Sequence, residues 1–159
     1  MYQGLLRYDI ANRSGAAIPL GLSYGLGVDS HGFVWNAQWT DNQIAKIGAD
    51  GTILFDRQLN PNGDCSRGLA VTADDNIWVA NSCSGSVSRL DNEGNLLKMI
   101  YVGKDPTGVA VDASGKVWVS NWHSDDVCRI DPTGGADHLG TLDLAVYLGA
   151  GAGPYTTAT

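Results

Sequence analysis

Residues 107–134 read TGVAVDASGKVWVSNWHSDDVCRIDPTG and contain three short runs in which apolar and polar side chains alternate. The runs cover residues 108–112, 116–121 and 126–131, with Ala-Ser-Gly between the first two. Alternation with a period of two predicts half-buried β-strands, and turn-forming residues between such runs predict tight turns. We therefore expect an antiparallel meander of three strands, followed by a fourth near residues 139–146.

Two earlier stretches of the chain repeat this pattern. Trp118 has counterparts in Trp35 and Trp78, and successive tryptophans lie about 40 residues apart. The glycine ten positions before each tryptophan and the valine seven positions before it are also repeated, as Gly25, Gly68 and Gly108 and as Val28, Val71 and Val111. Short strands at this period are typical of β-propeller blades, which are four-stranded antiparallel sheets with strands A to D. The sequence predicts an all-β propeller whose repeated tryptophans pack between blades.

The repeat divides the chain into about three complete blades with partial blades at both ends. We assign residues 1–23 to the end of a preceding blade, 24–64, 65–106 and 107–146 to three blades, and 147–159 to the start of the next. The first partial blade should contain strands near residues 6–9 and 17–22, and a fifteenth strand should begin near Tyr155, which matches Thr107 in its repeat. Closed propellers have roughly four to eight blades, so we expect one incomplete propeller domain, or one completed by a second copy.

Composition and charge argue against two classes of partner. The chain is 43% hydrophobic with 21 glycines, as expected for a turn-rich β-protein. Its net charge of −7, with 10 Lys and Arg residues, argues against nucleic acid, which requires a basic surface. No apolar run reaches the roughly 18 residues of a membrane helix, so we expect no membrane span. Residues 1–15 lack the basic and apolar regions of a signal peptide.

Two of the repeats resemble those of a known group of propellers. Residues 68–94, GLAVTADDNIWVANSCSGSVSRLDNEG, and residues 106–134, PTGVAVDASGKVWVSNWHSDDVCRIDPTG, resemble repeats of the NHL / streptogramin-lyase-like (virginiamycin B lyase-like) propellers. The resemblance covers roughly residues 24–134. It implies the propeller fold, but blades of this pattern occur in lyases, in sugar-lactone hydrolases and in binding domains, so function must be argued from the site.

A resemblance to the sugar-lactone hydrolases of the regucalcin type implies metal ligands just before the glycine of strand A. These enzymes place Asn or Asp there, whereas this chain has Tyr24, Arg67 and Thr107. A guanidinium would repel a hard cation. Aspartates in the A–B turns, such as Asp29 and Asp112, are interpreted as turn caps rather than calcium ligands. We expect no metal and no cofactor.

A resemblance to the lyases implies a histidine and a glutamate that act as acid and base. The single glutamate, Glu93, falls in a C–D turn, and His31 and His138 fall away from the expected pocket. His123, beside Asp125 in a B–C turn, is the one candidate catalytic residue, because imidazole is a suitable general base near neutral pH.

The B–C and D–A turns, which gather at one end of each blade, also predict a binding surface. Their candidate ligand-binding residues combine aromatic, amide, guanidinium, imidazole and carboxylate groups: Tyr24, Trp39, Arg67, Asn81, Asn121, Trp122, His123 and Asp125. Such a set suits a small polar ligand, a carbohydrate or a peptide. The alternative is that Trp39 and Trp122 only seal the cleft between neighbouring blades.

Cysteine positions predict one disulfide. Cys65 and Cys83 lie nearly opposite each other, just beyond the ends of the A–B hairpin of the middle repeat, where opposed β-carbons are within about 5.5 Å. The alternative is two free cysteines, and Cys128 is expected to be a free structural thiol. A disulfide would imply a periplasmic or extracellular protein.

Three functions remain open from the sequence. The first is a secreted β-propeller scaffold that binds a ligand on its B–C and D–A turns. The second is a streptogramin-lyase-like C–O lyase whose catalytic residues lie mostly on blades outside this chain, with His123 as a local contributor. The third is a structural propeller segment completed by self-association.

Overall fold

The computed structural model describes residues 4–40, 42–59 and 65–157, and within these ranges it contains fourteen β-strands and no helix. The strands are β1 (Leu5–Asp9), β2 (Ser14–Ile18), β3 (Ser23–Val28), β4 (Val34–Gln38), β5 (Gln43–Ile47), β6 (Ile53–Gln58), β7 (Ser66–Val71), β8 (Ile77–Asn81), β9 (Ser86–Leu90), β10 (Leu96–Tyr101), β11 (Pro106–Val111), β12 (Val117–Asn121), β13 (Asp126–Asp131) and β14 (Thr141–Tyr147). The described part of the chain has no helix with the length and apolar character needed to cross a membrane.

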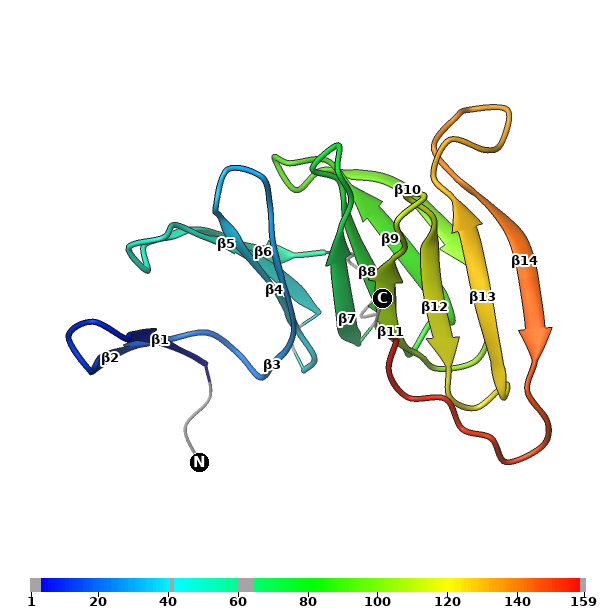
Figure 1. Cartoon of the computed structure of the whole chain (residues 1–159), viewed down its shortest axis with the longest axis horizontal. Coiled ribbons are helices and arrows are strands. Elements are labelled where there is room, and N and C mark those ends of the chain that lie inside the picture. Colours follow the sequence, from blue (N-terminus) through cyan, green and yellow to red (C-terminus); the bar gives the residue numbers. More distant parts are fainter. Residues whose placement is uncertain (1–3, 41, 60–64, 158–159) are drawn as a thin grey trace.

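The strands form one two-stranded and three four-stranded antiparallel sheets, each a meander in chain order. The complete sheets are β3–β6, β7–β10 and β11–β14, and in each the strands correspond to A, B, C and D of the repeat. Figure 1 shows them as successive blades that follow the β1–β2 hairpin. The prediction of propeller blades is confirmed.

The repeated glycines of strand A allow the innermost strands to approach each other. β3 lies beside β7, and β7 lies beside β11. A β-carbon at Gly25 would overlap with the carbonyl oxygen of Arg67, and one at Gly68 would overlap with that of Thr107. A side chain at either position would therefore force the inner strands of two blades apart.

The hydrophobic core lies between consecutive blades. Trp35 packs with the next blade's Leu69 and Ile77, and Trp78 packs with residues of the last blade such as Val117. Both tryptophans are fully buried, which confirms their predicted role, whereas Trp118 in the last blade is partly exposed.

The A–B turns are closed by aspartate side chains, as predicted. Asp112 Oδ1 accepts hydrogen bonds from the backbone N–H groups of Ser114 and Lys116, at 2.8 and 3.0 Å. Its Oδ2 accepts the indole N–H of Trp118 at 2.7 Å, so the turn also fixes the repeated tryptophan. Asp29 caps the first blade's A–B turn in the same way.

The two ends of the chain differ from the prediction. The second strand of the partial blade is Ser14–Ile18 rather than residues 17–22, because the Asp9 carboxylate accepts the backbone N–H of Asn12 and closes the turn early. No fifteenth strand forms among the described residues. Instead, residues 148–157 run as a loop beside β11 (Figure 1), where the Thr107 hydroxyl donates to the Tyr155 carbonyl at 2.5 Å.

Candidate functional site

The B–C and D–A turns meet at one end of the blades, as predicted. Backbone hydrogen bonds extend each A–B strand pair into these turns: the Trp39 N–H donates to the Leu22 carbonyl at 2.9 Å, and the Trp122 N–H donates to the Asp105 carbonyl at 3.0 Å. The side chains that follow strand B are thereby held next to those that precede strand A. This end of the molecule is called the turn face below.

Two predicted residues of the turn face, Tyr24 and Trp39, lie around the guanidinium of a third, Arg67. The Arg67 guanidinium carbon lies 4.0 Å from the ring centroid of Trp39, 5.5 Å from that of Tyr24 and 5.8 Å from that of Tyr155. These distances are those of cation–π contacts. The four residues Tyr24, Trp39, Arg67 and Tyr155 are called the Arg67 cage.

The repeat itself explains why the cage forms. Tyr24 and Arg67 each stand just before the glycine of strand A, and Tyr155 holds the corresponding position at the end of the chain. Because the inner strands are adjacent, equivalent positions of different blades converge. The Tyr24 and Tyr155 hydroxyls are hydrogen-bonded to each other. Partial burial, followed by this hydrogen bond, raises the pKa of Tyr24, so its hydroxyl stays protonated near neutral pH.

A second group of residues lies next to the cage. The indole of Trp122 stacks on the His123 ring, with centroids 4.4 Å apart and planes 19° apart, and meets the Tyr155 ring edge-on at 5.6 Å. His123 Nδ1 is hydrogen-bonded to the Asp105 carboxylate. Tyr155 therefore joins the Arg67 cage to the histidine.

Asp125 has a different role from the one expected beside His123. Its carboxylate accepts the backbone N–H groups of Gly151 and Gly153, both at 2.9 Å, and these bonds lower its pKa. The hydrogen-bond partner of His123 is Asp105 instead. Asp125 holds the segment that carries Tyr155 against the turn face.

A cleft of about 600 Å³ opens beside His123. It is lined by the B–C turn of the middle blade, residues 82–85, by residues 101–105 before β11, and by His123 itself. This volume lies in the range of small-molecule sites. The cleft, the histidine and the Arg67 cage thus form one continuous surface through Trp122 and Tyr155.

The two predicted asparagines lie inside the blades and not on this surface. Asn81 and Asn121 are fully buried at the ends of β8 and β12. Asn81 Nδ2 donates to the hydroxyls of Ser86 and Ser88, and Asn121 Nδ2 donates to the Asp126 carboxylate at 2.5 Å. Their position makes them supports of the B–C turns.

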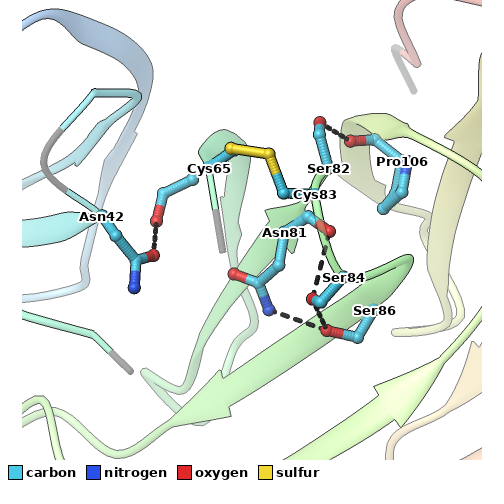
Figure 2. The surroundings of a disulfide bond; sticks show 9 residues. Asn42, Cys65, Asn81, Ser82, Cys83, Ser84, Ser86 and Pro106 are labelled. Atoms are coloured by element: carbon cyan, nitrogen blue, oxygen red, sulfur yellow. Dashed lines mark hydrogen bonds between the residues drawn. A yellow bond between two sulfur atoms is a disulfide. The ribbon is translucent and has the colours of Figure 1, made fainter. Parts of the chain in front are cut away.

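Cys65 and Cys83 form a disulfide with Cα atoms 5.3 Å apart, as predicted (Figure 2). The bond ties the residue before β7 to the B–C turn that forms one wall of the cleft. In the same turn, the Ser82 hydroxyl donates to the Pro106 carbonyl at 2.5 Å, which links the turn to the next blade. Cys128 is free and buried, also as predicted, and burial is the main cause that raises the pKa of its thiol to about 11.

Two residues of the site, Tyr155 and Asp105, were absent from the predicted set. Tyr155 could have been found from its repeat position, which it shares with Tyr24 and Arg67. Asp105 gave no such signal, because its contact with His123 depends on a D–A turn in which its backbone adopts φ +50°.

Comparisons with known proteins identify the fold. No family model matches the sequence, and no curated protein matches it either. Among solved structures, virginiamycin B lyase from Staphylococcus aureus superposes with a TM-score of 0.83 at 16% identity, over 98% of this chain and 52% of that one. A streptogramin B lyase superposes at 0.77 with 22% identity, over 91% and 48%, and a functionally unknown protein from Desulfotomaculum acetoxidans at 0.76 with 13% identity, over 98% and 52%. The chain thus spans about half the length of these structures, and it has the streptogramin-lyase-like β-propeller fold.

Proposed function

We propose that the protein is a secreted β-propeller binding scaffold that holds a small polar ligand, a carbohydrate or a peptide on its turn face. The observation that carries the proposal is the continuous aromatic surface of Tyr24, Tyr155 and Trp122 beside a cleft of about 600 Å³. These three rings are 43%, 43% and 38% exposed. They are therefore not simply part of the interior between blades.

The chemistry of this surface suits ligands with both apolar faces and polar edges. Exposed aromatic rings bury large areas of a ligand at a low cost in side-chain entropy. Arg67, His123 and Asp105 supply charged and hydrogen-bonding groups next to the rings. Asp125 and the disulfide hold the flanking segments in place, so that part of the site is preorganised.

The Cys65–Cys83 disulfide supports the secreted location. Disulfides form and persist in oxidising compartments and are rare in the cytosol.

A panel of neutral and charged oligosaccharides and short peptides, titrated while tryptophan fluorescence is recorded, tests the binding function. Trp122→Ala should weaken binding of any hit by about tenfold or more, since a stacked aromatic contact is lost. Tyr147→Ala, which removes an exposed ring from β14, is the matched control and should keep wild-type affinity. Equal binding by both variants, or no binding by the wild type, would contradict the proposal.

The hydrogen bond between His123 and Asp105 favours the lyase as a second candidate function. A carboxylate at Nδ1 holds the proton on that nitrogen and leaves Nε2 free to act as a general base. Two of the superposed structures are lyases by name, which is the enzyme class of this candidate. Purified protein incubated with a type B streptogramin should then produce the ring-opened product, and His123→Ala should abolish it. Absence of product from the wild type would rule out lyase activity of this chain.

Self-association is the structural alternative, and the partly exposed Trp118 face favours it. A second copy that covered this face would double the mass measured by light scattering. A stable monomer at high concentration would rule this out.

A further inference from the structure

We propose that the Arg67 cage is an oxyanion site and that it receives a carboxylate or phosphate group of the ligand. The inference rests on the proposed binding function and names the chemical class that the turn face selects. The guanidinium of Arg67 lies over three aromatic rings.

The hydrogen-bond donors of Arg67 are unpaired. Its Nε and Nη1 atoms are buried and have no hydrogen-bond partner within the described ranges. A buried donor without a partner costs about 1–3 kcal/mol, and more for a charged group. Native proteins keep few such groups, and a bound ion is one of the explanations for those that remain.

Other arginines of the chain show how the same side chain behaves when its role is structural. The guanidinium of Arg89 also has a buried Nε without a partner, but its Nη1 donates to the Pro132 carbonyl at 2.6 Å and its Nη2 donates to Asp74 at 3.1 Å. Arg129 pairs with the Asp143 carboxylate at 3.0 Å. In a chain with a net charge of −7, Arg67 has an ion pair with none of the described carboxylates.

The surroundings of Arg67 favour an oxyanion over a neutral group. Aromatic rings contact the guanidinium, whose planar N–H groups match two oxygens of a carboxylate or phosphate. Because Nε and Nη1 are buried, a neighbouring ring must move for an oxyanion to reach them. The rings also exclude water, which strengthens an ion pair formed there.

The two tyrosines add a further donor. Tyr24 and Tyr155 share one hydrogen bond between their hydroxyls, which uses one of the two hydroxyl protons. The other proton remains available on a tyrosine that is 43% exposed. An entering oxyanion would thus accept from the guanidinium and from one tyrosine hydroxyl.

The direct test is the NMR signal of the Arg67 Nε–H group in the oxidised protein. Acetate, galacturonate and inorganic phosphate are titrated separately, and galactose is the neutral match of galacturonate. We expect the anions to shift this signal while galactose does not, and galacturonate to bind about tenfold more tightly than galactose. A response to phosphate alone would assign the group as a phosphate, and a response to the carboxylates alone would assign it as a carboxylate.

Variants separate the cage from the rest of the turn face. Arg67→Met should remove the preference for galacturonate over galactose, and Tyr155→Phe, which keeps the ring, should reduce it several-fold. Arg129→Met, on the open face of the last blade, is the control and should retain the preference. If Arg67→Met does not fold, the wild-type NMR titration and the galacturonate preference of Tyr155→Phe still show whether the cage binds an oxyanion.

No shift of the Arg67 Nε–H signal with any of the three anions would overturn the oxyanion site, even if the turn face bound neutral ligands through Trp122. Conversely, an anion-dependent shift with no hit from the oligosaccharide and peptide panel would support the oxyanion site and contradict the broader proposal.

Discussion

Trp78 in the middle blade and Trp118 in the last blade occupy the same repeat position but different environments. The indole N–H of Trp78 donates to the Thr72 hydroxyl at 3.2 Å, and that of Trp118 donates to Asp112 at 2.7 Å, so each is held by its own A–B turn. Trp78 is fully buried because residues such as Val117 of the next blade cover it, whereas Trp118 is partly exposed. The burial of a blade's tryptophan therefore depends on the blade that follows.

The arginines that lie over these two tryptophans, Arg89 and Arg129, also differ in whether they contact the next blade. Arg89 lies over the Trp78 ring and reaches across to the Pro132 carbonyl of the next blade, at 2.6 Å. Arg129 lies over the Trp118 ring and pairs with Asp143 of its own blade. The same residue type thus joins two blades in one place and closes a single blade in the other.

Replacing the two tryptophans should give the largest difference. Trp78→Ala leaves a cavity between two blades and should lower the free energy of unfolding by about 3–5 kcal/mol. Trp118→Ala removes less buried area and should cost about 1–2 kcal/mol. Urea unfolding followed by circular dichroism measures both. Equal losses would show that the following blade does not determine the contribution of this position.

Removing the disulfide of the middle blade should cause the next largest loss in the free energy of unfolding. The double variant Cys65→Ser/Cys83→Ser should lose about 3 kcal/mol, since the bond restricts the unfolded chain. Reductant should destabilise the wild type and leave the double variant unchanged. Cys128→Ser, in the last blade, serves as the single-cysteine control, and it should leave the response to reductant intact. Alkylation of all three cysteines in denatured, unreduced protein would contradict the disulfide.

Substitutions of Arg89 and Arg129 should differ less in the free energy of unfolding than those of the two tryptophans. Arg89→Met removes both the donor of the Pro132 carbonyl and the ion pair with Asp74, and it should cost about 1–3 kcal/mol. Arg129→Met breaks a partly exposed ion pair and should cost at most about 1 kcal/mol, with a loss that shrinks at high salt. If the two variants were equally destabilised at both salt concentrations, the bond between blades would contribute no more than the bond within one.

The fold was largely predictable because its signals are local. The alternation around Trp118, the repeated glycines and the opposed positions of Cys65 and Cys83 each follow from strand geometry. The surface of the site was less predictable. The burial of Asn81 depends on which way its side chain turns at the end of a strand, and the contact of Tyr155 with the cage depends on a loop where a strand was expected.

The smallest expected change in the free energy of unfolding comes from an ion pair between Lys116 and Asp131 in the last blade. The middle blade has no equivalent pair, because Asn76 stands at the position of Lys116. Lys116 Nζ lies 2.6 Å from Asp131 Oδ2, and this contact is the main cause that lowers the pKa of Asp131 from 3.8 to about 2. Because the pKa is lower in the folded state, the stabilisation is complete above the unfolded pKa and disappears as the pH falls through about 2. The free energy of unfolding of Asp131→Asn should therefore approach that of the wild type as the pH falls from neutral to about 2, and the same convergence is expected for Lys116→Met. A difference between wild type and Asp131→Asn that stayed constant over this range would show that the ion pair does not contribute to stability.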